Sequence, residues 1–395
     1  MARQGVPDAR WLSPGHWQFA DGRRRLGSGV NAAAAHRAAG TSAGMKSSVT
    51  SIDVARLAEV SQSAVSRTFT PGASVSEDTR RKVMEAARKL GYRPNAHARS
   101  LITKRSRIIG LVLSYLENLF YPVALEQLAK RLQRDGYHVL LFVTETQNAD
   151  ELVNEILQYH VDGIVLAATT LSSGLAQRCA DAAIPVVLFN RVMAAGSGAG
   201  AGTVSSVRSD NVAGGRALAR HLAETGHQRV AYIAGNEESS TNLERERGFR
   251  DGLAERGLRI WARGVGNYDF EQARVAAREL FKPAAERPDA VFVASDHMAF
   301  AVMDTLRFEL GLRIPADVSV VGFDNVPQAD WGSYRLTTVE QPVQPMVEAT
   351  VGLLQKYLRD DASPQSENVV VPGQLILRDS VRQGQAPAAR KRKNA

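Results

Sequence analysis

The chain has 395 residues, which is enough for two or three domains, and it carries a formal net charge of +8 with a single cysteine. One cysteine excludes a framework of disulfides, and no apolar run approaches the ~20 residues that a membrane span needs. The N-terminal region lacks the continuous apolar stretch of a secretory signal, so we expect a cytoplasmic protein without a membrane partner.

Positive charge is concentrated outside the central part of the chain. Residues 45–107 hold 13 Lys and Arg against 5 Asp and Glu, whereas residues 108–383 hold 26 against 34. Residues 1–44 and the last twelve residues are also basic, each with a net charge of +4. This distribution is typical of a small DNA-binding module attached to a larger acidic body that has a separate role.

Residues 1–44 are rich in Gly, Ala, Ser and Arg and show no sustained periodicity, so we expect them to be disordered. Met45 directly precedes the first helical pattern, which leads to the hypothesis that translation starts there. The intact mass of the native protein would test it, because a mass that includes residues 1–44 would exclude it. The alternative is a basic arm that adds nonspecific phosphate contacts.

Three short helices are predicted between residues 50 and 91, each with its own start signal. Thr50 and Asp53 have the spacing of a capping box, and an apolar face follows, formed by Ile52, Val54, Ala55, Leu57 and Ala58. Ser61 caps a second helix over Gln62–Phe69. Ser76 caps a third helix, which Gly91 ends. A short helix, a tight turn and a second helix form a helix-turn-helix, whose second helix enters the major groove of DNA.

The exposed residues near the start of the second helix are Gln62, Ser63 and Arg67. Gln can bond adenine at two atoms and Arg can do the same with guanine, while Ser is permissive. This local pattern also fits an ordinary helical bundle with a polar face, and by itself it leaves the two alternatives equally open.

The segment DVARLAEVSQSAVSRTF, followed by VSEDTRRKVMEAARKLGYRPNAHARSL, resembles the DNA-binding domain of the LacI/GalR (lactose-repressor) family. The resemblance implies that Gln62, Ser63 and Arg67 read bases. It also implies phosphate or positioning contacts from Thr50, Ser61, Ser66 and Asn95. Two residues depart from the family, because Glu59 stands where a turn Gly is usual and Thr70 replaces a common Asn. The departure at Glu59 predicts a turn of different shape.

Residues 94–106 resemble the hinge helix and linker of the same family. Pro94 suits a first helical turn, and the segment is too short to be stable alone in water, so its order should depend on DNA and a partner chain. Ala98 is small enough for two such helices to approach each other, and Leu101 stands where the family places a leucine that wedges into the minor groove. The alternative is a plain linker with one exposed leucine.

From Arg107 onward, seven apolar runs alternate with helical segments. The runs cover residues 108–113, 138–144, 163–168, 186–190, 230–235, 290–295 and 318–324. Continuous apolar strands separated by helices indicate parallel sheets that are covered on both faces. We therefore predict an all-α headpiece over residues 45–93 and an α/β core over residues 107–383 with two doubly wound, parallel-sheet subdomains. The basic tail over residues 384–395 is expected to be disordered.

Four segments of this core resemble the effector-binding core of the LacI/GalR family, which is similar to periplasmic sugar-binding proteins. They are RSDNVAGGRALARHLAETGHQRVAYIAG, ERERGFRDGLAERG, RPDAVFVASDHMAF and LGLRIPADVSVVGFDN. The resemblance implies a first crossing between subdomains near Ala194–Gly202, a return near Leu336–Gln341 and a last crossing near Val369–Leu377. It also implies that Pro345–Leu358 packs on the first subdomain. Gly214 and Gly215 lie within a helical pattern, where we expect them to serve packing.

In open parallel sheets, ligands bind beyond the carboxyl ends of the strands. From this rule and the resemblance, we expect seven residues to contact a small effector: Phe120, Tyr121, Arg191, Thr241, Arg245, Tyr268 and Asp296. Aromatic faces can stack on a sugar ring, and Asp and Arg can fix hydroxyls or a carboxylate, so the effector is expected to be a sugar or sugar acid. Arg245 also fits an exposed helical charge pair and Asp296 a helix cap, whereas Asp324 and Asn325 are interpreted as structural turn residues.

Together these features predict a homodimeric transcriptional regulator that binds a palindromic DNA operator and responds to the effector. We expect it to repress transcription, with an inducer that relieves the repression. No cofactor is expected, because the histidines lack metal-ligand spacing and the sequence shows no nucleophile with a nearby base and no phosphate-binding loop. A transporter-type solute-binding protein and an enzyme on a flavodoxin-like sheet are the alternatives. The headpiece argues against the first, and the missing catalytic constellation argues against the second.

Overall fold

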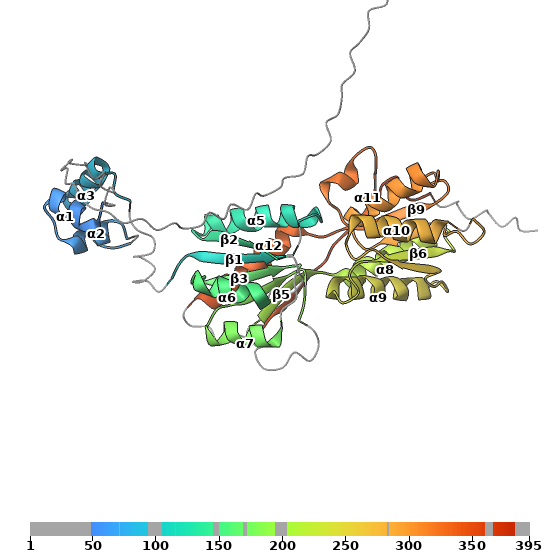
Figure 1. Cartoon of the computed structure of the whole chain (residues 1–395), viewed down its shortest axis with the longest axis horizontal. Coiled ribbons are helices and arrows are strands. Elements are labelled where there is room, and N and C mark those ends of the chain that lie inside the picture. Colours follow the sequence, from blue (N-terminus) through green and yellow to red (C-terminus); the bar gives the residue numbers. More distant parts are fainter. Residues whose placement is uncertain are drawn as a thin grey trace, which may run out of the picture. The chain divides into compact units, whose positions relative to one another are not determined.

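The computed structural model describes residues 49–70, 72–93, 105–114, 116–144, 150–168, 172–193, 204–282, 284–359 and 366–383 (Figure 1). The chain divides into two compact units, residues 1–94 and residues 95–395. We call the first unit the headpiece and the second the core, and each is described by itself. The predicted disordered ends, and Asn95, Ala98 and Leu101 of the predicted hinge, lie outside the described residues.

The headpiece consists of α1 (Ser51–Ala58), α2 (Gln62–Thr68) and α3 (Glu77–Leu90). Each helix begins where the sequence predicts it, since Thr50, Ser61 and Ser76 accept hydrogen bonds from backbone N–H groups of the first turns. Gly91 ends α3 in the left-handed conformation. The three helices share a small core of buried residues: Val54, Ala55, Ala58, Val65, Val83, Ala86 and Ala87.

Two expectations for α1 need correction. Ile52 and Leu57 are about half exposed, at 53% and 48%, so they do not belong to the buried face. Glu59 ends α1 with φ of 55° and ψ of 44°, which is the left-handed conformation that a glycine adopts most easily. The turn therefore keeps the backbone geometry that a glycine would give, at a cost of roughly 1–2 kcal/mol for a residue with a side chain.

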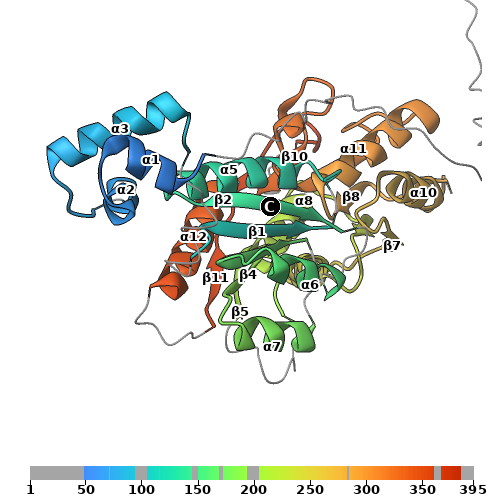
Figure 2. The same ribbon diagram turned by 60° about the vertical axis from the view of Figure 1, so that its left-hand side comes forward.

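The first subdomain of the core is built on a parallel sheet with the order β2-β1-β3-β4-β5-β11. Its strands are β1 (Ile108–Leu113), β2 (His138–Val143), β3 (Gly163–Ala167), β4 (Val186–Phe189), β5 (Val204–Ser209) and β11 (Asn368–Val371). Helices α5 (Phe120–Arg134) and α12 (Val343–Leu358) cover one face, and α6 (Asp150–Gln158) and α7 (Ser173–Asp181) cover the other (Figure 2).

The second subdomain repeats this arrangement with the order β7-β6-β8-β9-β10-β12. Its strands are β6 (Val230–Ala234), β7 (Ala262–Val265), β8 (Ala290–Val293), β9 (Ser319–Asp324), β10 (Thr337–Glu340) and β12 (Leu375–Ile376). Its helices are α8 (Asn211–Glu224), α9 (Ser240–Ala254), α10 (Phe270–Phe281) and α11 (Asp296–Asp304), with a π-helical turn over Thr305–Glu309 and a 3₁₀ turn over Pro327–Asp330. All of its pairings are parallel except that of β12 with β10.

The predicted fold class is confirmed, and all seven apolar runs are strands. Five further strands, β5, β7, β10, β11 and β12, were not predicted. The expected first crossing near Ala194–Gly202 is wrong by one strand, because β5 still belongs to the first sheet and the chain crosses at Asp210, between β5 and α8. The return after β10 and the last crossing between β11 and β12 fall where they were expected.

Glycines allow two close approaches in the core. A Cβ atom on Gly215 of α8 would lie 2.3 Å from the carbonyl oxygen of Arg245, and one on Gly248 of α9 would lie 2.0 Å from that of Val212, so these helices pack backbone to backbone. The expected packing role of the Gly214-Gly215 pair is thus confirmed. A Cβ atom on Gly373 would lie 2.2 Å from the carbonyl oxygen of Glu340, so two of the crossing segments lie side by side.

Candidate functional site

One face of α2 in the headpiece carries only exposed polar side chains. Gln62, Ser63, Ser66 and Arg67 lie on this face, while Val65 and Thr68 of the same helix are buried against α1 and α3. The Nε2 atom of Gln62 donates to the hydroxyl of Ser51 at 3.1 Å, and the Nε of Arg67 donates to the carbonyl oxygen of Ser63 at 3.4 Å. These bonds engage the Nε2 atom of Gln62 and the Nε atom of Arg67, and both side chains are exposed.

Two of the residues predicted to contact phosphate, Thr50 and Ser61, also form capping hydrogen bonds within the headpiece. The hydroxyl of Thr50 donates to Asp53 Oδ2 at 2.7 Å, and the backbone N–H of Thr50 donates to the same oxygen at 3.0 Å. Ser61 Oγ accepts from the N–H of Ala64 and lies 2.9 Å from Ser63 Oγ. Both residues are exposed at helix N-termini, which favour anions, so capping and phosphate contact are compatible.

In the core, four of the seven predicted effector residues meet where the strand ends of the two subdomains face each other. The guanidinium of Arg191, which follows β4, donates from Nη1 to Thr241 Oγ1 of α9 at 3.0 Å and to the hydroxyl of Tyr121 at 3.4 Å. Thr241 Oγ1 also lies 3.1 Å from the hydroxyl of Tyr268. Tyr121 and Arg191 come from the first subdomain and Thr241 and Tyr268 from the second, and all four are buried. We call these four residues the cleft cluster.

Arg245, on α9, is buried beside this cluster and does not form the exposed charge pair that its sequence context also allowed. Its Nη2 pairs with Asp324 Oδ1 at 3.3 Å, its Nε donates to Asn211 Oδ1 at 3.0 Å, and its guanidinium lies 3.8 Å from the centre of the Phe323 ring. Burial raises the pKa of Asp324, and the charge of Arg245 acts in the opposite direction. Asp324 is thus a direct partner of Arg245 in the cleft and more than a turn residue.

Asp296 is the first residue of α11, whereas Ser295 is the residue that caps this helix. Its two carboxylate oxygens accept hydrogen bonds from the Thr338 hydroxyl at 2.6 Å and from the backbone N–H of Val326 at 3.0 Å. Burial and the nearby Asp324 carboxylate raise the pKa of Asp296. These contacts link the start of α11 to β10 and to the loop after β9, and the contact of Asp296 with an effector stays a prediction.

A groove with a volume of about 510 Å³ opens beside the cleft cluster, and the ring of Phe120 forms part of its wall. That ring stacks on Phe189, with centroids 6.2 Å apart. The groove is also lined by Asp324, the loop that follows it, and the crossing segments around Gln341 and Pro372. None of the four cleft-cluster residues lines this groove, which is bounded by α5, the loop after β9 and the crossing segments.

Four buried oxygens near the strand ends have no hydrogen-bond partner within the described part of the chain: Asn190 Oδ1, Ser209 Oγ, Asp324 Oδ2 and Gln341 Oε1. Buried acceptors of this kind are costly unless a donor reaches them, so they favour a ligand with hydroxyl groups. Gln341 was missed because it follows β10, which was itself not predicted. A search for polar residues after every strand finds it once β10 is known.

Within the described residues there is no group of three or more His, Cys, Asp or Glu side chains that could hold a metal ion. None of the described helices is both long enough and apolar enough to cross a membrane.

Two family models match this chain. Residues 51–95 match the model described as bacterial regulatory proteins, lacI family, and residues 219–381 match a periplasmic binding protein-like domain. The first match covers the three helices of the headpiece up to the start of the predicted hinge. The second covers most of the second subdomain and its crossings.

Similar proteins extend over nearly the whole chain. Catabolite control protein A of Priestia megaterium is 30% identical over 340 residues, which cover 85% of this chain and 99% of that protein. The transcriptional regulator CelR of Thermobifida fusca is 32% identical over 335 residues, covering 83% and 96%. The repressor PurR of Vibrio vulnificus is 30% identical over 339 residues, covering 84% and 98%.

Solved structures give the same result. The lac repressor dimer bound to operator and the anti-inducer ONPF aligns with a TM-score of 0.73 at 26% identity, covering 85% of this chain and 99% of that one. A complex of the regulator CelR with cellobiose aligns with a TM-score of 0.63 at 30% identity, covering 84% and 99%. Both the headpiece and the core therefore have counterparts in single chains of known structure.

Proposed function

The chain belongs to the LacI/GalR family of bacterial regulatory proteins, and from this membership we propose that it is a repressor whose hold on a DNA operator is set by a small sugar-like effector. The observation that carries the proposal is the pairing of an exposed polar face on α2 with a buried polar cluster between two subdomains. One part suits DNA recognition and the other suits binding of a small molecule.

In this proposal the headpiece, residues 45–93, reads the operator. Gln62, Ser63 and Arg67 contact base edges in the major groove, while Thr50, Ser61, Ser66 and Asn95 contact phosphates or position the helices. Ala98 and Leu101 act in the hinge, residues 94–106, where Leu101 wedges into the minor groove. The support is the exposure of all three base-reading residues and the capped start of α2.

The effector binds between the two subdomains of residues 107–383. Tyr121, Arg191, Thr241 and Tyr268 supply its first contacts, Phe120 offers a ring face, and Arg245 and Asp296 complete the predicted set. Two observations support a sugar or a sugar acid as the effector. The related regulator CelR has a structure in complex with cellobiose, and several buried oxygens near the strand ends have no hydrogen-bond donor among the described residues. Because DNA binding is its task, the protein acts in the cytoplasm.

The protein binds a palindromic operator as a homodimer, as the dimeric lac repressor structure on its operator suggests. Effector binding shifts the two subdomains relative to each other and so moves the hinge segments together or apart. Coupling of this kind typically changes operator affinity by about 1–3 kcal/mol. An inducer that lowers operator affinity fits the repressor role.

The test is a selection of bound sequences from random duplex DNA with the full chain, repeated with a panel of sugars and sugar acids. The expected result is one palindrome whose occupancy falls with one compound. Enrichment of no sequence would overturn the proposal. A palindrome whose occupancy no small molecule changes would keep the DNA-binding role and remove the effector part. Turnover of a sugar without DNA binding would make the protein an enzyme.

A further inference from the structure

The groove beside the cleft cluster holds two buried oxygens that nothing in the described part of the chain satisfies. They are Oδ2 of Asp324 and Oε1 of Gln341, and both residues line the groove and are only 3% exposed. The groove volume of about 510 Å³ lies within the range of about 300–1,000 Å³ for small-molecule sites. A buried acceptor without a donor is costly, so the two oxygens favour a ligand that donates hydrogen bonds.

The two oxygens belong to one hydrogen-bonded pair of side chains. Gln341 Nε2 donates to Asp324 Oδ1 at 2.6 Å, and the backbone N–H of Gln341 donates to the carbonyl oxygen of Asp324 at 3.1 Å. These bonds hold the two residues together where the neighbouring strands β9 and β10 end. Because one bond joins the two side-chain groups, a single small molecule can reach both unpaired oxygens.

Asp324 presents an acceptor to the groove because its other oxygen already receives two donors. Oδ1 accepts from Gln341 and pairs with Arg245 Nη2 at 3.3 Å. Burial raises the pKa of Asp324 to about 6, against the charge of Arg245 and the amides of Gln341 and Asn118, so the carboxyl group is ionised at neutral pH. The Asn118 amide lies near enough to lower this pKa but makes no hydrogen bond to Oδ2.

The groove contains no cation that a carboxylate ligand could use. None of its lining residues is Lys, Arg or His, whereas Asp324 and Glu340 are acidic. Arg245, which pairs with Asp324, has a partner for each guanidinium nitrogen, since Nε donates to Asn211 Oδ1 and Nη1 to the carbonyl oxygen of Ala294. The charges of Arg245 and Asp324 therefore offset each other.

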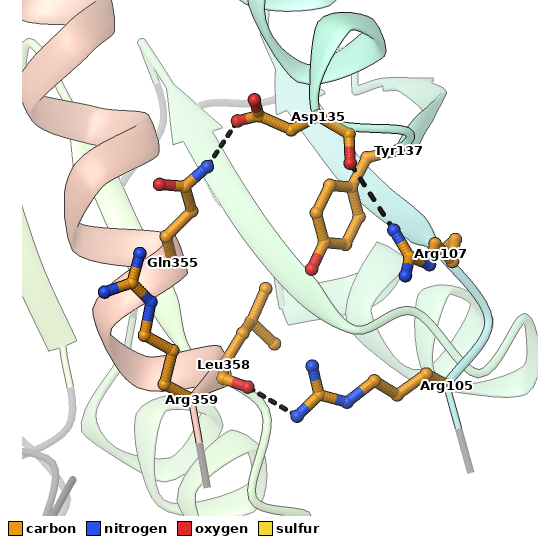
Figure 3. A pocket seen from close by; sticks show the side chains of 7 residues that line it. All are labelled: Arg105, Arg107, Asp135, Tyr137, Gln355, Leu358 and Arg359. Carbon is orange, nitrogen blue, oxygen red and sulfur yellow. Dashed lines mark hydrogen bonds between the residues drawn. The ribbon is translucent and has the colours of Figure 1, made fainter. Parts of the chain in front are cut away.

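Arginines elsewhere in the first subdomain do not line the groove either. Arg191 belongs to the cleft cluster, and Arg105, Arg107 and Arg359 line a separate hollow of about 310 Å³ at the amino-terminal edge of the sheet, as Figure 3 shows. A carboxylate in the groove would thus meet acidic residues and no arginine of the lining.

We infer that the effector is a neutral polyhydroxyl sugar and not a sugar acid, and that Asp324 Oδ2 and Gln341 Oε1 accept hydrogen bonds from its hydroxyl groups. This inference rests on the proposed function and narrows it, since that function leaves both classes of effector open. A hydroxyl group donates without bringing a charge, whereas an ionised carboxylate has no hydrogen to donate. An ammonium group would gain little, because Arg245 already offsets the charge of Asp324.

Hydration alone is the structural alternative. An ordered water molecule can satisfy a buried oxygen, but it takes up only about 30 Å³. The groove is many times larger, and Phe120 and Val123 give it an apolar wall that suits the carbon-bearing face of a sugar ring.

The test is titration calorimetry of the full chain, without DNA, at neutral pH and constant ionic strength. The probes are neutral pentoses, hexoses and disaccharides, each beside its matching acid, such as glucose with glucuronate and cellobiose with cellobionate. We expect at least one neutral sugar to bind saturably. Its acid should bind at least about tenfold more weakly, because like charges placed together in a site are unfavourable.

Two variants connect this preference with the two oxygens. Gln341→Met removes the acceptor and keeps the length of the side chain, so affinity for the neutral sugar should fall about tenfold. Asp324→Asn should also weaken the neutral sugar, and it should shrink the difference between the sugar and its acid because Arg245 loses its paired charge. Gln133→Met is the matched control, since Gln133 is an exposed residue of α5 outside the groove.

Several outcomes would overturn the inference. Tighter binding of an acid than of its neutral partner would do so while leaving the proposed function intact. Saturable binding of no neutral sugar, or tighter binding of glucosamine than of glucose, would also contradict it. An unchanged ratio of the two affinities in Asp324→Asn would separate the preference from this carboxylate. Operator selection by the wild-type chain needs no sugar, so the DNA-binding part of the proposed function can fail or succeed independently.

Discussion

Arg67 projects from the exposed face of α2 with a single long hydrogen bond, to the carbonyl oxygen of Ser63. If its guanidinium forms two bonds to one guanine, Arg67→Ala should reduce discrimination at that base pair by about 1–3 kcal/mol. Affinities for the selected operator and its single-base variants would measure this loss. The control is Arg88→Ala, which removes an exposed arginine from α3. Equal weakening by Arg67→Ala on all sequences would mean that Arg67 contacts phosphate.

His227 makes the stability of the second subdomain depend on pH. Its imidazole is fully buried, with Nδ1 3.0 Å from the carbonyl oxygen of Leu222 and Nε2 2.8 Å from Ser319 Oγ. Burial lowers the pKa of His227, as does the charge of Arg382, while the bond to Leu222 and the charge of Asp289 act in the opposite direction.

The unfolded chain therefore takes up this proton at higher pH than the folded chain. The contribution of His227 to the free energy of unfolding is complete above its unfolded pKa of about 6.5 and is lost as the pH falls toward the lower folded pKa, by at most about 1.4 kcal/mol per pH unit. The free energy of unfolding, measured by urea denaturation at several values between about pH 7 and pH 5, should change less steeply with pH in His227→Gln than in wild type. His138→Gln, at an exposed position, should keep the wild-type slope.

Residues whose neighbours are close in sequence could be predicted well. The caps at Thr50, Ser61 and Ser76 depend on N–H groups three residues away, so a local pattern was sufficient. The partners of Arg245 could not be found in this way, because Asn211 and Asp324 lie 34 and 79 positions from it in the chain. Only the folded sheet brings these three side chains together.

At the scale of elements, the close packing of α8 against α9 requires glycine at the positions where their backbones meet. Gly248→Ala would place a Cβ atom 2.0 Å from the carbonyl oxygen of Val212, and the helices would have to separate. We expect a loss of about 3 kcal/mol or more in the free energy of unfolding. Gly352 provides the control, because it is an exposed glycine of α12 with no heavy atom within 4 Å of the added Cβ.

Gly352→Ala should instead stabilise the core by about 0.5–1 kcal/mol, since alanine favours a helix more than glycine does. Denaturant midpoints of the two variants would measure both effects. Similar changes of the same sign in the two variants would show that α8 and α9 can adjust to the added methyl group.

The missed strands share a physical cause. The seven predicted strands are continuous apolar runs, whereas β5 reads VSSVRS and still lies between β4 and β11. Two of its three buried serines have partners, since Ser205 Oγ lies 2.7 Å from the hydroxyl of Tyr357 and Ser206 Oγ donates to Asn368 at 2.6 Å. Those partners lie more than 150 residues away, so hydrophobic periodicity alone could not detect this strand.

At the scale of the whole molecule, an ion pair joins the two subdomains beside the cleft cluster. Arg208 of β5 donates from Nε to both carboxylate oxygens of Glu244 on α9, at 3.1 and 3.2 Å. Because this pair stabilises one relative position of the subdomains, Glu244→Gln should reduce the coupling between effector and operator by about 1 kcal/mol. The measurement is the ratio of operator affinities with and without saturating effector.

Glu255→Gln is the control, because Glu255 pairs with Arg216 and Arg220 within the second subdomain. It removes the same charge without touching the cleft, so its coupling should equal that of the wild-type chain. A loss of coupling in Glu255→Gln as large as that in Glu244→Gln would contradict a special role for the pair between the subdomains.

The order in which the chain builds its two sheets also matters during translation. The headpiece helices end at Leu90, whereas the first subdomain waits for α12 and for β11, which ends at Val371, after ten strands have already been made. On the ribosome, the part that reads DNA is therefore complete long before either half of the sensor can close. A chain released early would contain the complete headpiece but not a complete effector-binding core, so an effector could not control its binding to DNA.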